Sequence, residues 1–140
     1  MNIDYLAGFF DGEGCITIMR RGSASKPAFP RIVISSNCVE IIEMIRESLK
    51  VKGFLSLPNR HRSTFQLNIS SSKEVIYVAT LLLPHLFLKR EVMEAGLQLA
   101  QRIESKVGRL RGGFTSEETF ERERLVYIIR ACNARHGRLK

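Results

Sequence analysis

The chain has 140 residues, of which 44% are hydrophobic, enough for the core of one globular domain. Its 22 lysines and arginines outnumber 14 aspartates and glutamates, which gives a net charge of +8. This charge favours a polyanionic partner, and nucleic acid more than a membrane surface. The alternative is a basic surface that is only solvated. Three widely spaced cysteines exclude a disulfide framework, and no apolar run has the roughly 20 residues of a membrane span, so we expect an intracellular protein without a membrane segment.

The first predicted element is a short helix that runs into the turn at residues 11–14. Its apolar residues recur at i, i+3 and i+7 and form one stripe, made of Ile3, Leu6 and Phe10. Gly8 and Gly12, with Ala7 beside them, form a flat face on another side of the helix. Glycine is unfavourable inside a helix, and close packing of a second helix against this face would compensate for it.

The turn at the end of this helix carries two carboxylates, Asp11 and Glu13. The C-terminus of a helix has a partial negative charge, so carboxylates there are electrostatically unfavourable unless a cation joins them. The turn therefore indicates a divalent metal ion.

Four strands are predicted from the alternation of apolar and polar residues, at 15–21, 30–36, 54–57 and 63–70. The turn-rich residues 22–27 join the first two strands. Residues 58–62 form a positively charged hairpin tip between the last two. Between the two pairs, a capping box at Asn37–Glu40, with Asn37 as N-cap, begins a helix that ends before Gly53.

The second half of the chain is predicted to be mainly helical, with helices at 72–83 and at about 91–105. Residues 106–113 form a basic, glycine-punctuated linker that we expect to contact phosphates or to stay mobile. A capping signal at residues 115–118 begins a final helix, with apolar positions at Phe120, Leu125, Ile128 and Ile129. For the basic tail, residues 130–140, a disordered segment and a DNA clamp are equally compatible with the composition.

The outward residues of the four strands form one face that is rich in arginine and amide side chains, which hydrogen-bond base edges in the major groove of DNA. An ordinary solvated sheet face is the alternative, but the overall charge favours DNA. The candidate DNA contacts on this face and its loops are Thr17, Met19, Arg21, Lys26, Arg31, Val33, Arg60, Arg62, Gln66 and Asn68.

Residues 6–14, Leu-Ala-Gly-Phe-Phe-Asp-Gly-Glu-Gly, resemble the LAGLIDADG motif of homing endonucleases position for position, with Glu13 where the family more often has aspartate. The order of predicted elements, helix, two strands, helix, two strands, helix, resembles the αββαββα core of that family over residues 1–105. The resemblance implies an α+β fold with a four-stranded antiparallel, saddle-shaped sheet plus C-terminal helices. It also implies that the whole chain is one endonuclease domain.

The motif occurs once, so the resemblance implies the homodimeric (I-CreI-like) branch of the family, with two motif helices packed through Ala7, Gly8, Asp11 and Gly12. It implies metal-dependent hydrolysis of a long, pseudo-palindromic double-stranded DNA site. The implied metal ligands are Glu13 and the backbone carbonyl of Gly12, which suit Mg²⁺ or Mn²⁺. Lys89 matches a basic residue near the scissile phosphate, with an exposed lysine at a helix start as the alternative. Ser36 stands where the family often has a water-positioning glutamine.

A non-cleaving protein of the same fold, either a maturase that binds intron RNA or a DNA-binding regulator, is the alternative function. The presence of Glu13 and Lys89 favours cleavage, because a carboxylate without a metal would repel DNA. The resemblance further implies an intron- or intein-associated protein, in an organelle or in the cytoplasm of a bacterium or archaeon.

Overall fold

The structure is a computed structural model that describes residues 1–22 and 27–139. The first half of the chain forms α1 (Ile3–Glu13), β1 (Gly14–Arg20), β2 (Ala28–Ser36), α2 (Val39–Leu49), β3 (Phe54–Ser56) and β4 (Phe65–Ile69). The second half forms α3 (Ser72–Leu82), the 3-10 helix η1 (Leu83–His85), α4 (Arg90–Ser105), β5 (Arg109–Leu110), β6 (Gly113–Phe114) and α5 (Ser116–Leu139).

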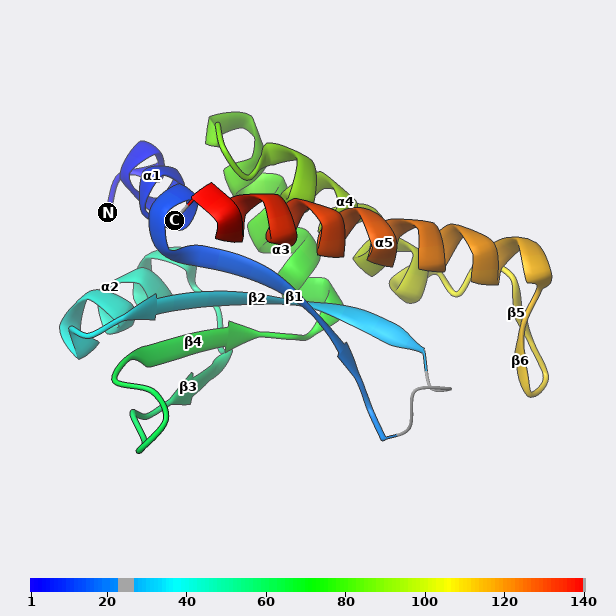
Figure 1. The fold of residues 1–140 in the computed structure, drawn as a ribbon, viewed down its shortest axis with the longest axis horizontal. Helices are drawn as coiled ribbons and strands as arrows, with labels where there is room; N and C mark the ends of the chain where they lie inside the picture. The colour runs from blue at the N-terminus through cyan, green and yellow to red at the C-terminus, as the bar shows by residue number, and fades with distance from the viewer. Residues whose placement is uncertain (23–26, 140) are drawn as a thin grey trace.

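Four strands form one antiparallel sheet in the order β1-β2-β4-β3, and α3, α4 and α5 lie over one of its faces (Figure 1). The α+β fold, the order of the elements and the four-stranded sheet are therefore confirmed. In the described part of the chain, no helix has the length and apolar character needed to cross a bilayer.

The core lies between the sheet and the helices. The inward residues of the strands, among them Ile16, Ile32 and Leu67, are fully buried there. They alternate with outward residues because successive side chains of a strand point to opposite faces. Both α1 and α2 add buried residues to the same core, such as Phe10 and Ile42.

Helix α5 packs along the edge strand β1. The side-chain amide of Asn133 donates to the backbone carbonyl of Ile16 at 2.7 Å, and Arg20 pairs with Glu123 at 3.1 Å. The first contact occupies a backbone carbonyl at a sheet edge, which would otherwise be open to another chain, and the second is a side-chain ion pair that holds α5 to the same strand.

The basic linker is structured, because β5 pairs with β6 in a small hairpin. A buried charge cluster holds this hairpin to the start of α5. The carboxylate of Glu118 accepts from Arg102 at 2.7 Å and from Arg122 at 2.9 Å, and the guanidinium of Arg122 lies 4.0 Å from the centroid of the Phe114 ring. The expectation that the linker stays mobile is therefore wrong, whereas its contact with phosphates stays a prediction.

The predicted start of α2 requires a correction. Cys38, not Asn37, is the N-cap residue, and its N–H donates to the hydroxyl of Ser36 at 3.1 Å. β2 ends at Ser36, as predicted, and the Ser36 hydroxyl, rather than the Asn37 side chain, accepts an N–H at the start of the helix. The N–H of Glu40, and secondly the thiol of Cys38, donate to the Glu40 carboxylate and lower its pKa.

Residues 130–139 continue α5, so the disordered alternative for the tail is not observed over these residues, and its contact with DNA stays a prediction. The predicted apolar positions of the final helix need one correction. Phe120 is exposed, because the buried side of α5 is formed by Glu118, Arg122, Leu125, Val126, Ile129 and Cys132, and Phe120 falls opposite to it.

Candidate functional site

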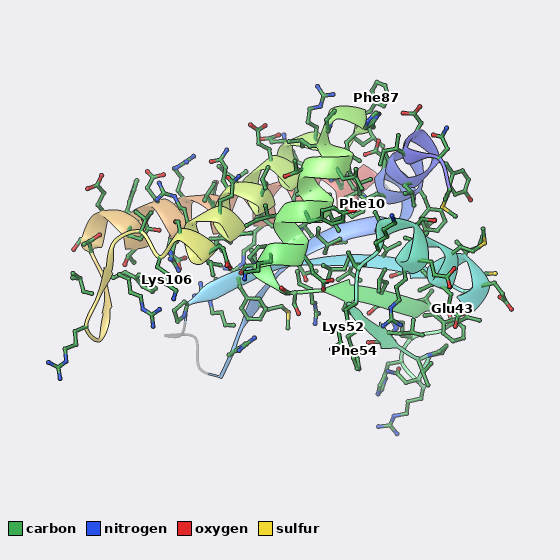
Figure 2. The ribbon with its side chains drawn as sticks, turned by 180° about the vertical axis from the view of Figure 1, so that it is seen from behind. Phe10, Glu43, Lys52, Phe54, Phe87 and Lys106 are labelled. Carbon is green, nitrogen blue, oxygen red and sulfur yellow. The ribbon has the colours of Figure 1, made fainter. Side chains whose placement is uncertain are left out.

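Helix α1 has one face in the core and one face open. Phe10 lies inside the fold (Figure 2), and Leu6 is buried beside it. Gly8 and Gly12 are exposed, and a Cβ atom added to either would have no atom of the described residues within 4 Å. Packing within this chain therefore does not require glycine at these two positions.

Ala7 is 0% exposed and belongs to the core of its own chain. Its expected contact with a second copy is therefore corrected, because no surface of this residue remains for a partner to cover. The other predicted interface residues, Gly8, Asp11 and Gly12, retain exposed surface, and their role in a dimer stays a prediction.

The two carboxylates at the end of α1 have different surroundings. Asp11 accepts the backbone N–H groups of Phe87 and Lys89, at 2.9 and 3.0 Å, one on each oxygen. It therefore ties α1 to the turn before α4, as a structural residue would. Glu13 is the last residue of α1 and is exposed.

The side chain of Lys89 makes a second connection between these two segments. Its ammonium group donates to the backbone carbonyls of Phe10, at 3.2 Å, and Gly14, and lies 5.8 Å from the centroid of the Phe10 ring. The residue is only 5% exposed, so the alternative of an exposed lysine at a helix start is wrong. A cation thus meets the partial negative charge at the end of α1 within the chain itself. We call the contacts of Asp11 and Lys89 across these two segments the reciprocal clamp.

Gly14 is required by packing. A Cβ atom at this position would overlap the ring of Phe10, which is itself fully buried. The close approach of β1 to the last turn of α1 therefore depends on a missing side chain.

Ser36 lies at the same end of the sheet as Glu13, since Gly14 pairs with Ile34 and Ser36 follows two residues later. Its hydroxyl accepts the N–H of Cys38 and so helps to begin α2. Its predicted role in positioning water stays a prediction.

The donor set around Glu13 suits a hard cation. Carboxylate and carbonyl oxygens are the ligands that Mg²⁺ and Mn²⁺ prefer, and both Glu13 and Gly12 are exposed. Among the described residues, no group of three or more histidines, cysteines, aspartates or glutamates is arranged to hold a metal ion. A metal-binding role for Glu13 and Gly12 therefore stays a prediction.

The register of the sheet confirms that the predicted outward residues share one face. Thr17 stands opposite Arg31, Ser35 opposite Gln66, and Val33 opposite Asn68. Opposed residues of antiparallel strands point to the same side. We call this side the open face; it also includes Met19.

Individual residues of the open face differ in how exposed they are and in whether their polar atoms are already hydrogen-bonded. The Nε of Arg31 is buried and has no hydrogen-bond partner among the described residues. Val33 and Asn68 are each 6% exposed, and the side-chain nitrogen of Asn68 donates to Ser56 Oγ at 2.9 Å. Arg21, just beyond β1, is exposed, with its guanidinium 5.4 Å from the centroid of the Phe29 ring. Contact of these side chains with DNA stays a prediction.

The hairpin tip between β3 and β4 is confirmed, with Asn59 and Arg62 exchanging backbone hydrogen bonds. The guanidinium of Arg62 donates to the carbonyls of Leu57 and Thr64, at 2.7 and 3.0 Å, and so stabilises the tip. Arg60 is exposed. Lys26, another predicted DNA contact, lies outside the described residues.

Sequence reasoning missed several exposed apolar side chains near these surfaces. Phe87 is 89% exposed, and Figure 2 shows it projecting from the turn next to α1, with the exposed Leu88 following it. Phe54, on the three-residue strand β3, is 68% exposed. So short a strand carries little alternation, and the turn before α4 has none, so no periodic signal indicated these positions.

The sequence matches the model of one protein family, described as LAGLIDADG endonuclease, over residues 6–86. No curated protein sequence matches the chain. Among solved structures, the homing endonuclease I-CvuI, in complex with its target in the presence of Ca, has a TM-score of 0.75 at 19% identity, covering 93% of this chain and 80% of that chain.

Two further DNA complexes are similar in fold. The archaeal intron-encoded homing endonuclease I-Vdi141I, complexed with DNA, has a TM-score of 0.66 at 16% identity, covering 94% of this chain and 96% of that one. The LAGLIDADG meganuclease I-AabMI, bound to uncleaved DNA, has a TM-score of 0.67 at 23% identity, covering 81% of this chain but only 41% of that one.

Proposed function

Because this chain belongs to the LAGLIDADG endonuclease family, we propose that it is a site-specific endonuclease that cuts both strands of DNA as a homodimer. One observation carries the proposal. The motif helix presents Glu13 to solvent, while the reciprocal clamp fixes the end of the helix that carries it.

The homodimer is supported by the exposed side of α1 that carries Gly8 and Gly12. Gly8 and Gly12 leave a surface that no described side chain of this chain covers, and the exposed rings of Tyr5 and Phe87 lie on the same helix and on the turn tied to it. Contiguous exposed apolar surface is typical of an interface. The chain covers 41% of I-AabMI, so two copies would together correspond to most of such a longer chain.

The metal requirement is supported by the position of Glu13. Packing of two copies through α1 would bring two such carboxylates together, each beside the carbonyl of its own Gly12. A divalent ion held there would activate water and neutralise charge on the leaving oxygen. The chain's own contribution is positional, because the clamp keeps the last turn of α1 in place. Mg²⁺ or Mn²⁺ fits these oxygen ligands.

DNA binding is supported by the open face. Its exposed or half-buried members include Thr17, Arg31 and Gln66, whose polar side chains are of the types that hydrogen-bond base edges. A two-fold symmetric dimer presents two such faces, which corresponds to a long pseudo-palindromic site.

The test is cleavage of a randomised duplex DNA library with Mg²⁺, beside the same reaction in EDTA. We expect metal-dependent double-strand cuts at one pseudo-palindromic sequence. Glu13→Gln should abolish cutting and keep specific binding, whereas Glu117→Gln, an exposed glutamate at the start of α5, should cut like the unmodified protein. Cutting that persists in Glu13→Gln would refute the assignment of Glu13.

A second candidate function is a non-cleaving protein of the same fold that binds DNA or intron RNA. It is favoured by the engagement of Lys89 and Ser36, whose side chains make hydrogen bonds within the chain. Tight, specific binding without cuts in Mg²⁺ or Mn²⁺ would select this function.

A further inference from the structure

The edge strand β3 carries an exposed aromatic residue, Phe54. It stands opposite Asn68, which stands opposite Val33, so it belongs to the open face together with Arg31 and Gln66. Figure 2 shows its ring pointing away from the helices. Phe54 is 68% exposed, so its phenyl group can contact an apolar group of a molecule bound to this face.

The surroundings of the ring offer little hydrogen bonding to a base. The side-chain nitrogen of Asn68 donates to the neighbouring strand β3, to the carbonyl of Phe54 at 3.2 Å and to Ser56 Oγ at 2.9 Å. Its amide donor is therefore used within the sheet. The residue next in this row, Val33, is apolar.

An open hollow of about 200 Å³ lies beside the ring, with Lys52 among its lining residues. Glu74 also lines it, but its carboxylate accepts the backbone N–H groups of Lys52, at 2.7 Å, and Gly53, at 3.3 Å. These donors offset the negative charge of Glu74. The ammonium of Lys52 is exposed at the same place and can pair with a phosphate.

Thymine matches this combination of groups. In the major groove it is distinguished by a C5-methyl group, which proteins read by apolar contact, including contact with phenylalanine. We propose that Phe54 reads the methyl group of a thymine in the target duplex, with Lys52 on the neighbouring backbone. The proposal rests on the proposed function and adds a specificity-determining residue to it.

The experiment begins with a binding site selected from randomised duplex DNA in the presence of Ca²⁺. Each thymine of one half-site is then replaced in turn by deoxyuridine, which removes only the methyl group, and affinity is measured by fluorescence anisotropy. At one position we expect the unmodified protein to bind deoxyuridine DNA about fourfold more weakly than thymine DNA. This factor corresponds to the lost burial of one methyl group.

Protein variants locate the effect. Phe54→Ala should bind more weakly and show no further loss at that position, while Phe54→Leu, which keeps an apolar side chain, should retain part of the discrimination. Tyr127→Ala removes an exposed aromatic ring on α5, away from the open face, and should keep the unmodified pattern. Circular dichroism confirms that each variant is folded.

Three results would overturn the proposal. The first is equal affinity at every deoxyuridine position, or a loss that is the same in Phe54→Ala. The second is a changed molar mass of Phe54→Ala without DNA, which would assign the ring to a protein interface. The third is the absence of specific DNA binding by the unmodified protein, which would refute the proposed function as well. Specific binding without methyl discrimination refutes this inference alone.

Discussion

Replacing Asp11 by alanine should destabilise the protein, although Asp11 lies at the surface of the turn. Its two oxygens accept the N–H groups of Phe87 and Lys89, at 2.9 and 3.0 Å, directly before α4 begins. Loss of a side-chain acceptor at a helix start costs about 0.5–2 kcal/mol. For two such bonds at a partly exposed position, we expect the free energy of unfolding to fall by about 2 kcal/mol. For a chain of this length, that corresponds to a decrease in Tm of about 8 °C.

The measurement is urea unfolding followed by circular dichroism at one fixed protein concentration, because association makes stability depend on concentration. Asp11→Asn keeps one acceptor oxygen and should lose about half as much. Asp4→Ala removes an exposed carboxylate of the same helix, paired with His85 at 2.9 Å, and should change stability by less than about 1 kcal/mol. An Asp11→Ala midpoint equal to that of the unmodified protein would refute the structural role of Asp11.

The contacts of the reciprocal clamp should be energetically coupled. Lys89 binds Asp11 through its backbone and the end of α1 through its ammonium, so Asp11→Ala and Lys89→Met weaken one connection. Residues that share a network have coupling energies of about 0.5–3 kcal/mol in a double-mutant cycle. Strictly additive losses would show that the two contacts are independent.

Two glycine substitutions test the packing of α1. Gly14→Ala should lower the free energy of unfolding by about 1–3 kcal/mol, because the added methyl group overlaps the ring of Phe10. Gly113→Ala is the control and should have little effect, because no described atom lies within 4 Å of the added Cβ. Urea unfolding measures both variants. Gly8→Leu should leave the chain folded, since a Cβ atom at this position meets no described atom of its own chain, and should convert the proposed dimer to a monomer by filling the surface around Gly8 and Gly12. Light scattering measures this change, and an unchanged molar mass would contradict the interface.

The sheet could be predicted from the sequence because alternation is a local property. Thr17, Arg31 and Gln66 each flank apolar residues along their own strands, and this pattern alone placed them on one face before the register confirmed it. The motif helix was equally clear, since its apolar stripe and its glycines lie within 12 residues.

Features that depend on contacts distant in the sequence were not predictable in this way. The hairpin of β5 and β6 has two residues in each strand, too few to show a period. Glu118 and Arg122 are charged and read as surface residues of a helix, yet both are buried, because Arg102 from α4 completes their ion pairs. Lys89 is buried by α1, which lies about 75 residues earlier in the chain.

The position of Lys89 also changes what the acidic turn implies. The two carboxylates at the negative end of a helix indicated a missing cation, but the chain supplies much of the compensation itself. Backbone N–H groups offset the charge of Asp11, and the ammonium of Lys89 meets the carbonyls at the end of α1. Glu13 is the motif carboxylate that remains exposed. The electrostatic case for a metal ion therefore rests on Glu13, and it becomes strong where a second copy would place a second Glu13 beside the first, because two carboxylates in one site repel each other without a cation.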